Sequence, residues 1–134
     1  MVQCVTIPET GSTVLFGRSA KDNDYLTFRL PGRDPKKDIW LHALNVSGAH
    51  VVLRLASQQH LHTDLVVAAN IAAFYSQARG RKKVAVEYCQ LCHVKKVQSS
   101  PLGEVEARKT RIIIGMPESA MNLHHDQFCA STGG

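Results

Sequence analysis

Residues 63–79 constrain the fold more than any other segment, because they form a long run with almost no charge before the final arginine. The run is "TDLVVAANIAAFYSQAR", and its interruptions are few: Asp64, Asn70, Ser76 and Gln77. An apolar, alanine-rich composition of this length predicts a helix buried on most of its faces. Thr63 can cap the start of this helix, and Gly80 can supply the left-handed residue after its end.

The remaining periodic segments are short and rich in branched and aromatic residues, which predicts strands. We expect strands within residues 3–7, 13–17, 39–44, 50–55, 84–89 and 110–116. The turn signals Asn45 and Gly48 lie between the third and fourth of these, so we expect those two strands to pair. Three consecutive isoleucines in the last strand predict a central position in the sheet. Residues 23–30 fit a helix or a strand equally well.

These elements predict a single α+β domain, with a mixed or antiparallel sheet of about six short strands packed on one long buried helix. A chain of 134 residues is long enough for one such core. We expect residues 1–12 to be a lead-in, residues 13–117 to form the domain and residues 118–134 to be a flexible tail. The sequence shows neither a secretory signal nor an apolar run that could span a bilayer. We therefore expect a cytoplasmic protein, with an organellar location left open.

The segment "CQLCH", residues 89–93, is a C-x-x-C-H motif of the kind that attaches haem c. Its strand-like surroundings and the lack of an export signal argue against haem. Zinc is a stronger alternative, with Cys89, Cys92 and His93 as three ligands. The fourth ligand would be His124, His125 or Cys129. We favour a simpler interpretation, in which the cysteines pack as small apolar side chains and the protein has no cofactor or metal.

Two histidines, His42 and His50, fall within the paired strands after Trp40, where they could face each other as ligands, as catalytic bases or as hydrogen-bonded structural groups. The sequence contains no Ser-His-Asp order, phosphate loop or paired-carboxylate spacing. We therefore expect no enzymatic activity. An enzyme that acts on nucleic acid through His42 and His50 remains an alternative.

The chain is basic, with a formal net charge of +5 and a sequence pI near 9.2, which favours polyanionic partners. Its cations gather in three clusters: Arg79, Arg81, Lys82 and Lys83; Lys95 and Lys96; and Arg108, Lys109 and Arg111. A compact sheet could bring the three clusters together into one surface that faces phosphates. Aromatic residues that could stack on bases are few, so the pattern favours recognition of backbone and shape over the reading of bases.

Four segments carry a resemblance more specific than these clusters: "GRSAKDNDYLTFRL", "DIWLHALNVSGAHVVLR", "AANIAAFYSQAR" and "PLGEV" with "RKTRIII". In that order and at those spacings they resemble the NFACT-R domain, the RNA-binding module of ribosome-quality-control factors related to bacterial RqcH and eukaryotic NEMF. The similarity covers residues 13–117. The family's Pro-Gly-Ser-His appears here as residues 47–50, "SGAH", and its lysine-rich loop before the last strand is reduced to "VQSSPLGEV".

The resemblance implies an α+β domain that contacts tRNA or ribosomal RNA, in proteins that bind a large ribosomal subunit carrying a stalled nascent chain. It gives no reason to expect the tailing of stalled peptides, because the family's other domains do not fit into this chain. Our leading hypothesis is a non-catalytic RNA-binding protein whose cations contact phosphates: Arg18, Lys21, Arg79, Arg81, Lys82, Lys83, Lys95 and Lys96. Trp40, His42 and His50 would shape or line this surface. Asn23, Asp24 and Gly48 would support its loops.

Overall fold

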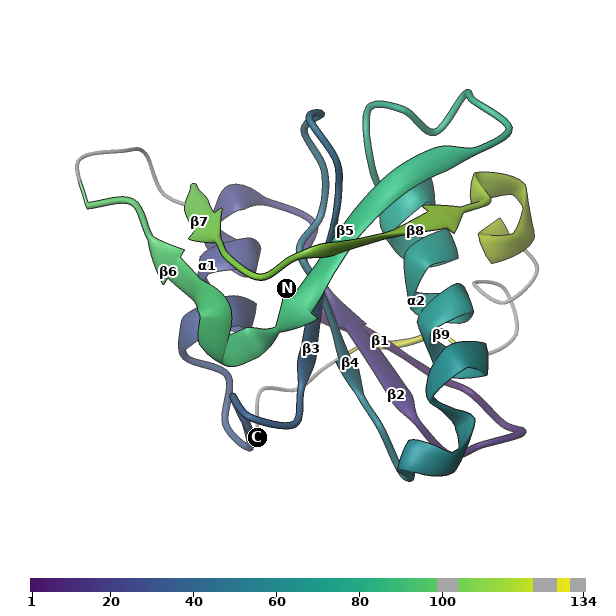
Figure 1. Ribbon diagram of the computed structural model, residues 1–134, viewed down its shortest axis with the longest axis horizontal. Coiled ribbons are helices and arrows are strands. Elements are labelled where there is room, and N and C mark those ends of the chain that lie inside the picture. Colours follow the sequence, from purple (N-terminus) through teal and green to yellow (C-terminus); the bar gives the residue numbers. More distant parts are fainter. Residues whose placement is uncertain (99–103, 122–127, 131–134) are drawn as a thin grey trace.

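The computed structural model describes residues 1–98, 104–121 and 128–130, and it contains one large antiparallel sheet (Figure 1). The strand order is β8-β5-β3-β4-β2-β1-β9, and every pairing between described strands is antiparallel. Its strands are β1 (Gln3–Thr6), β2 (Thr13–Phe16), β3 (Ile39–Ala43), β4 (Val51–Arg54), β5 (Val84–Gln90), β8 (Arg111–Gly115) and β9 (Phe128–Ala130). The predicted α+β class is confirmed, as is the pairing of the strands on either side of residues 44–50.

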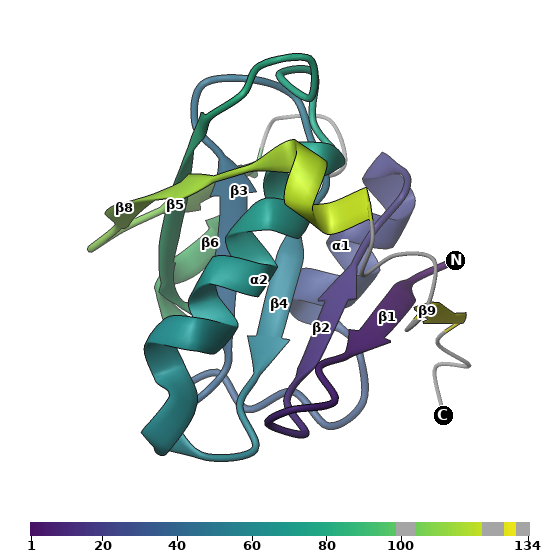
Figure 2. The ribbon, with the colours of Figure 1, turned by 90° about the vertical axis from the view of Figure 1, so that its right-hand side faces the viewer.

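Two helices cover opposite faces of this sheet, α1 (Ala20–Phe28) and α2 (Leu61–Phe74) (Figure 2). Alternate residues of β3 point to the two sides, as a strand requires. Leu41 and Ala43 join the core beneath α2, whereas Trp40 packs with Leu26 of α1 on the other side. The segment at residues 23–30, for which the sequence allowed two structures, is therefore mostly helical.

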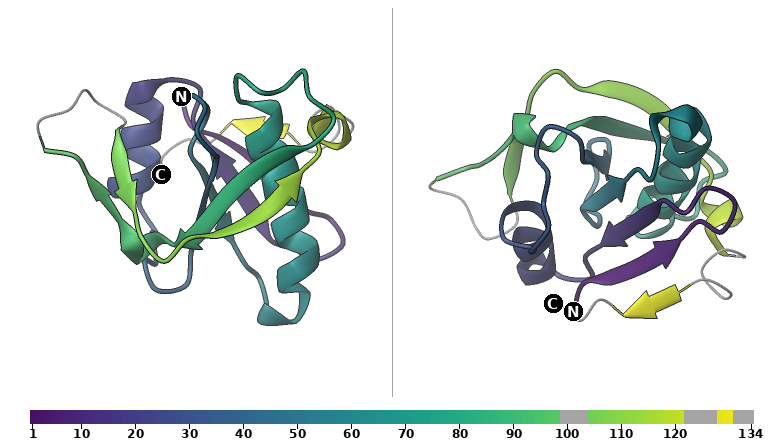
Figure 3. Two further views of the ribbon diagram at one scale, coloured as in Figure 1. Left: turned by 45° about the horizontal axis from the view of Figure 1, so that its top comes forward. Right: turned by 90° about the horizontal axis from the view of Figure 1, so that it is seen from below.

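A small second sheet lies beside α1 and consists of β6 (Val94–Lys96) and β7 (Val105–Ala107) (Figure 3). The 3₁₀ turn η2 (Leu91–His93) connects it to β5, and η1 (Gln58–His60) leads into α2. Lys96 joins the small sheet to α1, because its Nζ lies 2.9 Å from Asp24 Oδ1 and 5.2 Å from the centre of the Phe28 ring.

Helix α2 begins earlier and ends earlier than the sequence predicted, so Thr63 and Gly80 do not cap it. The loop between β3 and β4 explains the early end. Ala49 N donates to Tyr75 O at 2.9 Å, and Gln77 N donates to Ser47 O at 2.9 Å. These bonds pull residues 75–77 out of the helix and into a bridge with Gly48. In Figure 1 the β3–β4 loop and the connection from α2 to β5 both lie at the top of the molecule.

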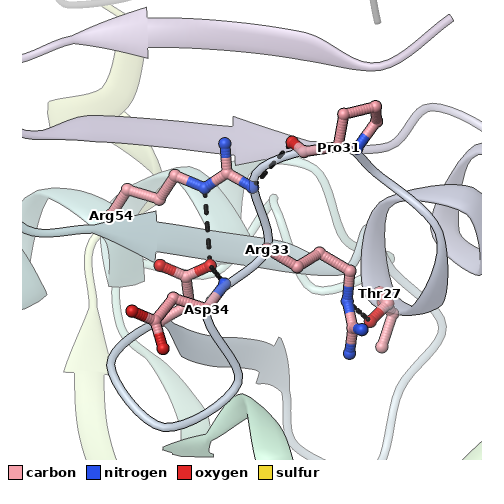
Figure 4. Close-up of polar contacts among 6 residues, drawn as sticks. Thr27, Pro31, Arg33, Asp34 and Arg54 are labelled. Carbon is pink, nitrogen blue, oxygen red and sulfur yellow. Dashed lines mark hydrogen bonds and ion pairs between the residues drawn. The ribbon is translucent and has the colours of Figure 1, made fainter.

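The loop before β3 is fixed by the buried carboxylate of Asp38 (Figure 4). Its Oδ2 accepts from Arg54 Nε at 3.4 Å and from Asp34 N at 2.9 Å. Arg54 also donates to Pro31 O, and Arg33 Nε donates to Thr27 O at 2.9 Å. Asp38 therefore sets where β3 begins.

The last predicted strand, β8, lies at an edge of the sheet, so its predicted central position is wrong. Ile113 packs against the core beneath α2, but Ile112 and Ile114 on the other face are 51% and 48% exposed. No described helix or strand covers that face of β8, which is why three consecutive isoleucines do not make a central strand here.

Two parts of the segment that the sequence predicted to be a flexible tail have regular secondary structure. Residues 117–121 are helical, and Ala120 is only 2% exposed within the core. Strand β9 pairs with β1 at the other edge of the sheet. The rest of that segment lies outside the described residues. Among the helices that the structure describes, none is long and apolar enough to cross a membrane.

Candidate nucleic-acid interface

A pocket of about 1110 Å³ opens on the face of the sheet that carries α1. Its walls come from the start of α1, the end of β3, the β3–β4 loop, the segment after α2, the middle of β5 and β7. The pocket is large enough for one or two nucleotides, since typical small-ligand sites are about 300–1,000 Å³. Because its walls come from separate helices, strands and loops, the pocket brings together segments that are far apart in the sequence.

Three aromatic rings form the floor of the pocket: Trp40, His42 and His50. The Trp40 and His42 rings are parallel, with centres 5.8 Å apart, and the His50 ring stands edge-on to both at 5.4 and 5.6 Å. Trp40 is 2% and His50 is 3% exposed, whereas His42 is half-buried. Trp40 and His50 thus support the floor, and His42 is the ring that a ligand can reach.

His50 is held by groups from α1 and the residues just before it. Its Nδ1 lies 2.8 Å from Thr27 Oγ1, and its backbone N–H donates to Asn23 Oδ1 at 3.0 Å. Its carbonyl accepts from Gly17 N at 3.2 Å. A Cβ on Gly17 would lie 2.3 Å from Asn23 Oδ1, so only glycine allows this close approach. Asn23, for which a supporting role was predicted, thus contacts the backbone of His50.

Two titratable groups face each other across β3 and β5, where His42 is paired with Glu87. Burial lowers the pKa of His42, although the nearby backbone groups of Ala43 and Gly48 oppose the shift, so the ring is neutral at pH 7. Burial raises the pKa of Glu87. Within the described residues Glu87 forms no ion pair. The pocket therefore holds one neutral imidazole and one partly desolvated carboxyl group.

Two arginines also line the pocket, each against an aromatic ring. The guanidinium carbon of Arg18 lies 5.1 Å from the Tyr75 ring centre, and that of Arg79 lies 4.3 Å from the Phe74 ring centre. Burial raises the pKa of Tyr75, and both arginines oppose that shift, so both are near its phenol. Neither guanidinium forms an ion pair with a described residue. Cation–π contacts orient both groups while leaving their N–H donors for a ligand.

The pocket gathers half of the residues that the sequence singled out: Arg18, Asn23, Trp40, His42, Gly48, His50 and Arg79. The others are not part of its lining: Lys21, Asp24, Arg81, Lys82, Lys83, Lys95 and Lys96. Asp24 is instead buried and paired with Lys96 and Arg29.

The predicted single basic surface is not formed. The cluster that contains Arg81, Lys82 and Lys83 precedes β5, whereas Lys95 and Lys96 follow its end. A seven-residue strand separates them by about 20 Å. The cluster near Arg111 lies at the same end of β5 as Lys95, because Arg111 pairs with Tyr88. The cations therefore occupy two ends of the domain.

The sequence did not point to Glu87, nor to the cation–π contacts that Phe74 and Tyr75 make with the arginines. The alternation of β5 placed Glu87 on one face with Cys89, but nothing in that pattern shows that the face opens into a pocket. The cation–π contacts depend on the early end of α2, and this end is set by hydrogen bonds to the distant β3–β4 loop.

The C-x-x-C-H segment spans the end of β5 and the turn η2 that follows it. Cys89 is buried against Trp40 in the α1-side core, and burial, Glu87 and Cys92 raise the pKa of its thiol to about 11. Cys92 is exposed, and its N–H donates to Pro35 O at 2.8 Å.

No group of three or more potential ligands that could hold a metal occurs among the described side chains. The predicted fourth zinc ligands, His124, His125 and Cys129, lie outside the residues whose side chains are described. The zinc alternative thus gains no support from Cys89, Cys92 or His93.

Comparison with known proteins gives consistent matches. The family described as "NFACT protein RNA binding domain" matches residues 1–108, so its match includes the first twelve residues. The Rqc2 homolog RqcH of Bacillus subtilis is 36% identical over 110 residues, which are 82% of this chain and 18% of that protein. The Rqc2 homolog RqcH of Streptococcus pneumoniae is 30% identical over 112 residues, covering 81% of this chain and 19% of that protein.

The solved structures that share the fold include the C-terminal part of the fibronectin/fibrinogen-binding protein from Streptococcus suis. Its TM-score is 0.75 with 23% sequence identity, over 90% of this chain and 48% of that one. The chain spans about a fifth of the length of the curated relatives that it matches.

Proposed function

Because the chain belongs to the family of NFACT RNA-binding domains, we propose that it binds structured RNA, tRNA or ribosomal RNA, through the pocket at the start of α1. The observation that carries this proposal is the pairing of two oriented arginines with a half-buried histidine in one pocket. Arg18 and Arg79 are suited to phosphates, which accept from guanidinium groups in charge-assisted bonds. His42 offers a ring that a base can contact.

We propose that this binding serves the quality control of stalled translation on the large ribosomal subunit, which would place the protein in the cytoplasm. Support comes from the RqcH relatives, of which this chain matches about a fifth. Because this stretch matches so small a part of those proteins, binding alone is proposed for it.

We also propose that the domain binds RNA without cleaving it. General acid–base catalysis needs groups that can reach the reacting atoms. His50 is buried and its Nδ1 is engaged by Thr27, so it is poorly placed for such a role. A ribonuclease activity lost in His42→Ala would contradict this part of the proposal.

The test is a binding titration against folded tRNA, an unstructured RNA and duplex DNA at several salt concentrations. The variant Arg18→Ala/Arg79→Ala removes both rim cations. Lys36→Ala/Lys37→Ala is the matched control, because it removes the same charge from exposed residues outside the pocket. Each lost phosphate contact reduces the slope of log affinity against log salt by about 0.7 to 0.9.

We expect the arginine variant to lower the slope by about 1.4 to 1.8 and to weaken binding to tRNA more than the lysine control does. Equal losses in the two variants would mean that only overall charge matters. A third variant, Arg81→Ala/Lys82→Ala/Lys83→Ala, shows whether the loop after α2 also contacts RNA, because this loop adjoins the pocket through Arg79.

A further inference from the structure

The charges inside the pocket are separated, and this separation limits what it can bind. Arg18 and Arg79 stand where the start of α1 meets the segment after α2. Glu87 and Glu104 line the part formed by β5 and β7. A phosphate is attracted to the first side and repelled by the second. A ligand that fits both sides must carry an anionic group at one end and hydrogen-bond donors at the other.

A nucleotide has this character, because its phosphate is anionic and its base carries N–H groups. Glu87 is half-buried and has no ion pair with a described residue, and this burial raises the pKa of its carboxyl group. Such a group is a strong acceptor for a donor that replaces the lost water. His42, paired with Glu87 across the two strands, provides a half-buried ring beside it.

The four RNA bases differ in the donors that their pairing edges present. Guanine places N1–H and the N2 amino group side by side, which matches the two oxygens of one carboxylate. Adenine and cytosine each place one amino group beside an acceptor nitrogen, and uracil places one N–H between two carbonyl oxygens. On this edge only guanine offers a carboxylate two adjacent donors, because in each of the other bases one of any two adjacent positions is an acceptor.

We infer that the pocket binds an unpaired guanine of the RNA, with the Glu87 carboxylate accepting from its N1–H and N2 amino groups and Arg18 and Arg79 contacting its flanking phosphates. This inference rests on the proposed function and adds a base preference to it. The base would lie against His42, which Trp40 supports from below. An unpaired position is required because the pairing edge of a base is occupied within a duplex.

The test uses RNA hairpins with one stem and a loop of uridines in which the central position is guanine, adenine, cytosine, uridine or inosine. Inosine keeps N1–H and lacks the amino group, so it isolates one of the two bonds. We expect guanine to bind about tenfold more tightly than the other three standard bases, with inosine between them, since one good bidentate pair is worth about that much discrimination.

The variant Glu87→Gln provides the decisive comparison. Glutamine has one donor and one acceptor, which fit adenine better than guanine, so the preference should move from guanine to adenine. Glu118→Gln is the control, because it makes the same charge change at an exposed residue outside the pocket lining. It should keep the guanine preference.

The outcomes separate this inference from the proposed function. If all hairpins bind equally whatever their central base, the guanine inference is overturned. RNA binding is left intact in that case if the salt dependence is steep and Arg18→Ala/Arg79→Ala reduces it. A guanine preference that persists in Glu87→Gln would overturn the role of Glu87. Binding that is absent, or indifferent to the arginine variant, would overturn the proposed function as well.

Discussion

Gly17 lies where the chain enters α1, and replacing it with alanine should damage both the fold and the pocket. The added Cβ would lie 2.3 Å from Asn23 Oδ1 and 2.9 Å from Asn23 N, far inside ordinary contact. To relieve this, Asn23 must turn away and give up the bond that it accepts from His50 N. The backbone at Asn23 must also shift by several tenths of an ångström.

The magnitude follows from three contributions. Loss of the acceptor from a part-buried N–H costs about 1 to 3 kcal/mol, and overpacking costs about 1 to 3 kcal/mol. Reduced freedom of the unfolded chain returns about 0.4 to 1 kcal/mol, because the φ of Gly17 is not in the left-handed region. We expect Gly17→Ala to lower the free energy of unfolding by about 1 to 5 kcal/mol.

Urea unfolding of Gly17→Ala against Gly80→Ala measures this. A Cβ added to Gly80 would have no atom within 4 Å, so this substitution should be neutral or slightly stabilising. In an Asn23→Ala background the penalty of Gly17→Ala should shrink, since the nearest clashing atom is gone. Equal stabilities of the Gly17 and Gly80 variants would refute the close approach on which the shape of the pocket depends.

Three further predictions concern single side chains. Thr27→Val, which removes the hydroxyl 2.8 Å from His50 Nδ1, should cost about 1 kcal/mol or more in urea unfolding and weaken tRNA binding; unchanged tRNA affinity would show that the position of His50 does not matter to the site. His42 has a lowered pKa in the folded state, so as the pH falls the unfolded chain takes up this proton first and the wild type loses stability below about pH 6.5. Between pH 7.5 and 5.5 the urea midpoint of His42→Gln should therefore fall less than that of the wild type, and equal falls would count against a neutral buried ring. Cys92→Ser at its exposed position should change stability by no more than about 0.5 kcal/mol and leave the metal content of the purified protein unchanged, whereas stoichiometric zinc lost in this variant would revive the metal hypothesis.

Much of the fold could be predicted because its signals are local. The apolar segment at residues 39–44 and the alternation of residues 84–89 predicted the strands β3 and β5, and β3 places Trp40 and His42 on the same side. The alanine-rich run predicted the buried helix. Its end could not be predicted, because the bonds from Ala49 and Gln77 to partners distant in sequence outweigh the helical tendency of residues 75–79.

The candidate site could be predicted only in part, for a related reason. The composition drew attention to the runs of cations. It could not show that β5 separates Arg81 from Lys95, because this separation depends on the topology of the fold. The resemblance, in contrast, pointed to Trp40, His42, Gly48 and His50, which the fold does bring together. Glu87 was missed because a single acid on a strand carries no signal of its own.

The central claim, that RNA occupies this pocket, is tested most directly by the indole N–H of Trp40. The chain contains one tryptophan, so its ring N–H gives a single NMR signal, and this buried group has no hydrogen-bond partner within the described part of the chain. Addition of folded tRNA should shift this signal in the wild type, and the shift should require a higher tRNA concentration in Arg18→Ala/Arg79→Ala. A tRNA complex that leaves the Trp40 signal unmoved, while the backbone signals of Lys82 and Lys83 shift, would place the RNA elsewhere and contradict the account.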